Sequence, residues 1–262
     1  MADKASELKL RVISAVILAV LAFIEVWAGG WLFAVFVSAM ALIVFLEWTA
    51  IIGLSAFERE RIMAVACMVM PLVMLIFLGT ASATFTLVLC AGLVFFLTRS
   101  TTAETCNWIT LAVVYCGLSA IALVGIRNHD EGIALILLLF AIVWGTDIGA
   151  YFVGRKLGGP KLAPRISPGK TQSGAIGGVI IAAVCALAIA GATGVVSVTG
   201  AIIIAFIVSC VSQAGDLFES YLKRRFNVKD SGVIIPGHGG LFDRVDGLMA
   251  ASIVFFVILL FT

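Results

Sequence analysis

Residues 133–155 read IALILLLFAIVWGTDIGAYFVGR, and this stretch decides the class of fold. Its first twelve residues form an unbroken apolar run, without the alternation of polar and apolar residues that a membrane β-strand shows. A helix needs roughly 20 mostly apolar residues to cross a hydrocarbon core about 30 Å thick. The stretch is therefore predicted to be a membrane-spanning helix, with Asp147 and Tyr151 near one of its ends.

The rest of the chain repeats this pattern. Of its 262 residues, 62% are hydrophobic and only 12% are charged, whereas a soluble globular domain is about 45–50% apolar. This composition excludes a soluble globule. We predict an all-α fold, a polytopic membrane bundle of about nine transmembrane helices, at residues 11–28, 31–50, 62–79, 82–98, 107–126, 133–153, 174–193, 197–222 and 247–262.

The basic residues predict the orientation of this bundle. With nine spans, 16 of the 17 Lys and Arg residues lie on the side of the amino terminus, and Arg127 is the exception. Because cytoplasmic loops are enriched in Lys and Arg, the amino terminus is predicted to be cytoplasmic. We expect an integral protein of a bacterial inner (cytoplasmic) membrane. The net charge of +2 gives no reason to expect a nucleic-acid partner.

Two long loops divide the chain by role. Residues 154–173 and 223–246 are rich in Gly, Pro, Lys and Arg, and both open on the predicted cytoplasmic face. Residues 1–130 are therefore interpreted as transmembrane helices that form a scaffold. Residues 131–262 are predicted to carry the catalytic site, formed by their helices and these two loops.

Acidic residues in or beside the predicted spans indicate function, because an ionised carboxylate in hydrocarbon is costly. Asp147 is near the inner end of the sixth span, and Asp243 and Asp246 come just before the last. The eighth span places four polar residues on one helical face, with spacings i, i+3, i+4 and i+7: Asp216, Glu219, Ser220 and Lys223. Carboxylates from three helices are thus predicted to converge on the inner surface.

Other acids have a simpler interpretation. Glu47, Glu58 and Glu60 fall at the ends of predicted spans. Such residues are usually solvated or lie at the level of the lipid headgroups, and we expect no site there. Glu25, near the outer end of the first span, has no explanation from the sequence.

Carboxylates beside many Lys and Arg residues favour chemistry on phosphates. Carboxylate oxygens bind Mg²⁺, which also takes substrate phosphate oxygens, while Lys and Arg orient phosphates. The glycine-containing segments SPGKT (167–171) and PGHGG (236–240) allow close approach of backbone N–H groups to an anion. The combination predicts phosphoryl or nucleotidyl transfer.

Residues 220–244 resemble the signature of the phosphatidate cytidylyltransferase (CDP-diacylglycerol synthase) family. The segments TDIGAYFVGRKLGG (146–159) and ISPGKTQSGAIGG (166–178) are similar to two further family segments. One departure concerns the usual Ser-Pro-Lys-Lys-Thr-x-Glu-Gly, where this chain has Gly169 in place of the first Lys and Ser173 in place of the Glu. The signature residues are Ser220, Lys223, Arg224, Lys229, Asp230, Pro236, His238, Gly239, Gly240, Asp243 and Arg244.

The resemblance implies a reaction of CTP with phosphatidic acid that gives CDP-diacylglycerol and pyrophosphate. It implies Mg²⁺, with a second cation, divalent or monovalent, and a homodimer. The implied metal ligands are Asp216 and Asp243, supported by Asp246 and Asp147. Lys223 and Arg224 would act with Asp216 and Asp243 in catalysis. The implied substrate-binding residues are Ser167, Lys170, Thr171, Ser220, Lys229, His238, Gly239, Gly240 and Arg244.

Two other functions are compatible with parts of this pattern. A CTP-dependent lipid-alcohol kinase would use the same nucleotide as a phosphoryl donor, although the complete signature favours cytidylyl transfer. An ion-coupled membrane transporter would use the carboxylates as ion sites. A transporter would place them near the bilayer midplane and would not need two long basic loops on one face.

Overall fold

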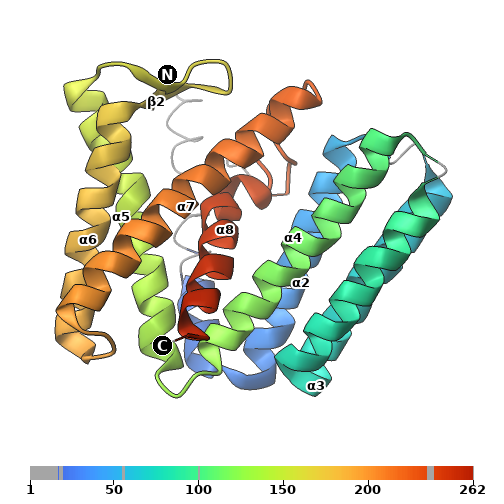
Figure 1. Cartoon of the computed structure of the whole chain (residues 1–262), viewed down its shortest axis with the longest axis horizontal. Helices are drawn as coiled ribbons and strands as arrows, with labels where there is room; N and C mark the ends of the chain where they lie inside the picture. Colours follow the sequence, from blue (N-terminus) through green and yellow to red (C-terminus); the bar gives the residue numbers. More distant parts are fainter. Residues whose placement is uncertain (1–16, 18–19, 55–56, 100, 235–238, 262) are drawn as a thin grey trace. The chain divides into compact units, whose positions relative to one another are not determined.

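The computed structural model describes the chain apart from residues 1–16, 18–19, 55–56, 100, 235–238 and 262 (Figure 1). Among the described residues, six helices, α2 to α7, are long and apolar enough to cross a membrane. The labelled elements are α2 (Gly30–Ile51), α3 (Glu58–Thr98), α4 (Ala103–Arg127), α5 (Gly132–Leu157), β1 (Lys161–Ala163), β2 (Ser167–Thr171), α6 (Gln172–Thr193), α7 (Val198–Arg225) and α8 (Phe242–Leu259).

These helices confirm the predicted helical membrane protein. Helices α2, α4, α5, α6 and α7 each cover one predicted span. Helix α8 begins at Phe242, ahead of the predicted start at residue 247. Residues 20–28 are helical, while most of the first predicted span, 11–28, lies outside the described residues. The total of nine spans stays a prediction.

Helix α3 covers two predicted spans, 62–79 and 82–98. Its 41 residues would extend about 60 Å if straight, twice the thickness of a hydrocarbon core. Gly79 interrupts it with φ 82° and ψ −174°, a backbone conformation that favours glycine. Figure 1 shows α3 reversing direction about midway along its length.

Exposed apolar side chains on α3 indicate its surroundings. Phe77, Phe85 and Val88 are 77%, 68% and 66% exposed. Large apolar patches of this kind are rare on soluble monomers. Lipid chains would cover them, in agreement with an integral membrane protein.

The chain forms two compact units, and the first comprises residues 1–124 and 226–245. Its core contains the fully buried Trp48 of α2. The Trp48 ring stacks on Phe242, with 5.5 Å between ring centroids, and lies 5.8 Å from the Tyr115 ring of α4. Aromatic pairs add about 0.5–1.5 kcal/mol beyond the burial of their area. This cluster therefore anchors the segment 226–245 on α2 and α4.

The second unit comprises residues 125–225 and 246–262, and its helices α5 and α6 approach closely. A Cβ atom added at Gly178 of α6 would lie 2.8 Å from the Thr146 carbonyl oxygen of α5. Helix α7 is joined to α5 by a buried hydrogen bond of 2.7 Å, which the Thr146 hydroxyl donates to Ser209. Small residues allow such backbone approach between membrane helices.

One element departs from the all-α expectation. Strands β1 and β2 form an antiparallel hairpin that pairs Lys161 with Thr171 and Ala163 with Ser167. It occupies the predicted loop 154–173 and contacts α5, α6 and α7. The sequence did not predict it because Gly and Pro are depleted in strands. Pro168 is tolerated here because both strands of a two-stranded ribbon are edges.

The α5–α6 contact can be tested with glycine substitutions. We expect Gly178→Ala to destabilise the protein by about 1–3 kcal/mol, because the added methyl group forces the two backbones apart. Gly191→Ala on the same helix is the control, since an added Cβ there has no atom within 4 Å. Thermal unfolding in detergent micelles measures both, and equal midpoints for the two variants would contradict the close contact.

Candidate active site

A cavity of about 690 Å³ opens in the second unit, a volume typical of small-molecule sites. Helices α5 and α7, the β1–β2 hairpin and the start of α6 line it. Its charged lining residues are Asp147, Arg155, Lys161, Lys170 and Asp216. The cavity therefore combines carboxylates, which attract cations, with cations, which attract phosphates.

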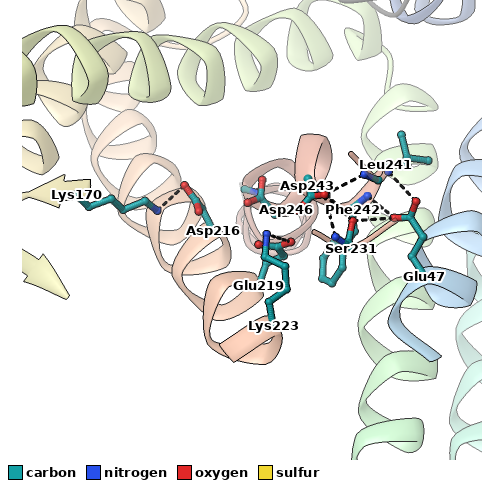
Figure 2. Close-up of polar contacts among 12 residues, drawn as sticks. Glu47, Lys170, Asp216, Glu219, Lys223, Ser231, Leu241, Phe242, Asp243 and Asp246 are labelled. Atoms are coloured by element: carbon teal, nitrogen blue, oxygen red, sulfur yellow. Dashed lines mark hydrogen bonds and ion pairs between the residues drawn. The ribbon is translucent and has the colours of Figure 1, made fainter. Parts of the chain in front are cut away.

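Lys170 and Asp216 form an ion pair across this cavity. The Lys170 ammonium of β2 contacts Oδ2 of Asp216 on α7 (Figure 2). The two side chains are 26% and 34% exposed, so solvent screens the pair and its net stabilisation is at most about 1 kcal/mol. Because the pair is weak and open to the cavity, both groups remain accessible to a ligand.

Three carboxylates from three helices lie within electrostatic reach of one another in this unit. The charge of Asp216 interacts with Asp147 of α5 and with Asp246 of α8. The positive charge of Lys170 also interacts with both of these carboxylates. The described residues contain no closed cluster of three metal-binding side chains. Mg²⁺ does not need such a cluster, because one or two carboxylates together with water and phosphate oxygens complete its coordination shell. The donor set fits a hard divalent cation bound together with a phosphate.

The end of the hairpin is fixed by two hydroxyl groups. Thr171 caps α6, since its Oγ1 accepts a hydrogen bond of 3.1 Å from the Gly174 N–H. The Ser173 hydroxyl donates to the Gly158 carbonyl oxygen and lies 3.1 Å from Thr171 Oγ1. Ser173, which departs from the family pattern, therefore joins the start of α6 to the glycine turn after α5.

Gly169, the other departure, lines the cavity. A Cβ atom added there would have no atom within 4 Å. The position is open space, so the missing side chain leaves no packing defect.

A second ion pair lies further along α7. The Lys223 ammonium is 2.7 Å from Oε1 of Glu219, and their side chains are 13% and 2% exposed. Both belong to the helical face predicted from the sequence, and α7 includes all four residues of that face. A buried ion pair of this kind holds the ammonium in place, which a flexible surface lysine would not achieve.

In the first unit, the described residues of the signature loop (229–234 and 239–241) include three that lie against Asp243: Ser231, Gly239 and Gly240. Oδ2 of Asp243 accepts hydrogen bonds of 3.0 and 2.9 Å from the Ser231 N–H and hydroxyl. It accepts another, of 2.9 Å, from the Gly240 N–H. A Cβ atom at Gly239, where φ is 82°, would lie 2.7 Å from the same oxygen. The described part of this loop is thus built closely around one carboxylate.

Sequence reasoning missed Glu47. The expectation of a solvated acid is wrong, because Glu47 is 5% exposed and accepts hydrogen bonds of 2.8 Å from the Leu241 and Phe242 N–H groups (Figure 2). The sequence FLEWTA (45–50) could have indicated burial, because it places an acid between large apolar residues with no adjacent basic residue. Its partners are almost 200 residues away in the chain, which no local pattern reveals.

The other predicted residues divide between the units. Thr171 lines the cavity with Asp147, Lys170 and Asp216, but Ser167 does not and instead pairs with Ala163 in the hairpin. His238 lies outside the described residues. The second unit also contains Ser220, Lys223, Arg224 and Asp246, and the first contains Lys229, Gly239, Gly240, Asp243 and Arg244.

Comparisons with known proteins agree with these features. Residues 9–262 match the model of the cytidylyltransferase family. A phosphatidate cytidylyltransferase of Brucella suis biovar 1 (strain 1330) is 40% identical over 248 residues, which cover 94% of this chain and 91% of that protein. One of Bacillus subtilis (strain 168) is 42% identical over 164 residues, or 62% of this chain and 61% of that protein.

The Thr171 cap can be tested by its stability effect. We expect Thr171→Ala to destabilise the protein by about 0.5–2 kcal/mol, because the Gly174 N–H loses its acceptor. Thr84→Ala is the control, since this exposed hydroxyl bonds only within its own helix; we expect a change within about 0.5 kcal/mol. Thermal unfolding compares the two, and an unchanged Thr171→Ala midpoint would contradict the cap.

Proposed function

Because the chain belongs to the cytidylyltransferase family, we propose that it transfers CMP from CTP to phosphatidic acid. A phosphatidic acid phosphate oxygen attacks the α-phosphorus of CTP. The bond from that phosphorus to the bridging oxygen of the β-phosphate breaks, so pyrophosphate leaves and CDP-diacylglycerol remains. The observation that carries this proposal is the cavity that pairs Lys170 with Asp216 beside further carboxylates.

The acidic residues of the second unit supply the cation site in this proposal. Asp216, with Asp147 and Asp246 nearby, would hold a divalent cation such as Mg²⁺. When bound, the cation neutralises charge on the phosphate oxygens. A second cation, divalent or monovalent, and a metal role for Asp243 follow from the family resemblance.

The basic residues bind and orient the phosphates. Lys170, Lys161 and Arg155 line the cavity and would contact the triphosphate. Lys223 is held by the buried Glu219 and would offset charge that develops on the leaving pyrophosphate. The lipid phosphate is already anionic at neutral pH, so the reaction needs no covalent nucleophile on the protein.

Location and orientation complete the proposal. The enzyme would lie in a bacterial inner membrane with its amino terminus and active site on the cytoplasmic side, as the distribution of basic residues predicts. Phosphatidic acid would arrive laterally at headgroup depth, and CTP from the cytoplasm. Assembly as a homodimer rests only on the family resemblance.

The position of the label in CTP tests the reaction and separates it from its alternatives. Purified protein with phosphatidic acid and Mg²⁺ should move ³²P from the α-position of CTP, and not from the γ-position, into the lipid phase. A lipid-alcohol kinase would move γ-label into an added polyprenol. A transporter would move neither label into lipid, and that result would sink the proposal.

Carboxylate substitutions test the two predicted metal ligands. We expect Asp216→Asn and Asp243→Asn each to lower kcat by about 100-fold or more, because an amide cannot replace a charged ligand. Asp130→Asn is the matched control, since Asp130 is exposed in the turn between α4 and α5. Steady-state rates over a range of Mg²⁺ concentrations measure the effect. Near-normal Mg²⁺-dependent activity in either variant would contradict a metal role for that residue.

A further inference from the structure

The buried carboxylate of Glu47 occupies a place made for it in the first unit. It accepts two hydrogen bonds of 2.8 Å from the N–H groups of Leu241 and Phe242, where α8 begins. The first N–H groups of a helix have no partner within the helix. A carboxylate at this end also interacts favourably with the helix dipole. Glu47, which belongs to α2, therefore supplies the cap that the sequence before α8 lacks.

Two glycines leave the room that this carboxylate fills. A Cβ atom at Gly232 would lie 2.7 Å from Oε1 of Glu47, and one at Gly240 would lie 2.7 Å from both carboxylate oxygens. Neither glycine has a left-handed φ, so steric space alone requires the absence of a side chain. The described part of the signature loop is consequently shaped around Glu47 as well as around Asp243.

Ser231 connects the two carboxylates. Its hydroxyl is 3.2 Å from Oε2 of Glu47 and 2.9 Å from Oδ2 of Asp243. A serine hydroxyl has a single proton, so the two carboxylates share one donor. The Asp243 N–H in turn lies 3.3 Å from the Ser231 oxygen. The position of Asp243 is therefore linked to Glu47 through one side chain and through the first turn of α8.

We propose that Glu47 is a positioning residue for Asp243: by capping α8 and sharing the Ser231 hydroxyl, it holds Ser231 and the first turn of α8 in place and so fixes the direction of the Asp243 carboxylate. This inference rests on the proposed function, in which Asp243 acts in cytidylyl transfer. Glu47 touches neither substrate nor cation in this account. It acts by holding the group that does.

Hydrogen exchange of the purified full chain tests the link without any measurement of activity. Glu47 has three donors: the Ser231 hydroxyl and the N–H groups of Leu241 and Phe242. In Glu47→Gln, one carboxylate oxygen becomes an NH₂ group, which cannot accept a hydrogen bond, so at least one of these donors loses its acceptor. We expect exchange of the Leu241 and Phe242 amides to rise by about tenfold or more. The Ser231 and Gly240 amides, whose acceptor is Asp243, should become faster as well. A cap that stabilises α8 alone would change only the first pair.

Kinetics separate positioning from a loss of folded protein. We expect Glu47→Gln to lower kcat by about 10- to 100-fold and to raise the Mg²⁺ concentration for half-maximal turnover. A smaller folded fraction would lower the apparent kcat but would not change that concentration. The control is Glu58→Gln, an exposed glutamate of the same unit, which should change neither quantity.

Two further variants keep the test decisive. Gly232→Ala retains every polar group but places a methyl group against Glu47, and should reproduce the Glu47→Gln exchange pattern. Gly92→Ala is its control, because an added Cβ there has no atom within 4 Å. In the double variant Glu47→Gln with Ser231→Ala, the loss of kcat should be smaller than the product of the single losses, since both break one network.

The outcomes distinguish this inference from the proposed function. If wild-type protein forms no lipid-soluble product, the proposed function fails and the inference fails with it. If wild type is active and Glu47→Gln retains its kcat, its Mg²⁺ dependence and slow exchange at Ser231 and Gly240, only the positioning role is overturned. Independent losses in the double variant would also overturn it.

Discussion

A carboxylate buried within an apolar membrane protein must obtain its hydrogen-bond donors from the protein itself, and this requirement shapes the first compact unit. No solvent replaces a missing partner at such a site, and an unsatisfied charge costs several kcal/mol. In the first unit Glu47 takes its donors from the start of α8 and from Ser231. The second unit differs, because Asp216 is 34% exposed and solvent screens its pair with Lys170. Long-range structure in the first unit follows from the Glu47 bonds, because they hold a distant loop against α2.

The sequence predicted what depends on local composition. Apolar runs predicted the helices, and helical spacing placed Glu219 and Lys223 together, where the structure has an ion pair. It could not predict that Glu47 is buried. The local sequence around a helix-end acid is the same whether its hydrogen bonds come from water or from a backbone N–H 194 residues away. The β1–β2 hairpin was also missed, since its strands are held by contacts with three helices rather than by strand propensity.

Four residues that the sequence selected by residue type and motif lie around one cavity, and their roles stay predictions. Asp147, Lys170, Thr171 and Asp216 come from three separate segments and line one cavity. The roles of the two residues that depart from the family pattern could be described only from the structure. Ser173 has a local bonding role at the hairpin, whereas Gly169 faces open space. The sequence departure alone cannot distinguish these two cases, because it does not show which atoms surround each residue.

The interruption of α3 at Gly79 has a consequence for how the chain enters a membrane. The residues around it, LGTASA, carry no charge, and the two halves of α3 meet there without a polar loop. During insertion, no charged segment would have to be translocated between these halves, so the bilayer poses little barrier to this connection. The two halves can therefore insert together as a helical hairpin. The turn between the two halves of α3 would then depend on one glycine rather than on a polar loop.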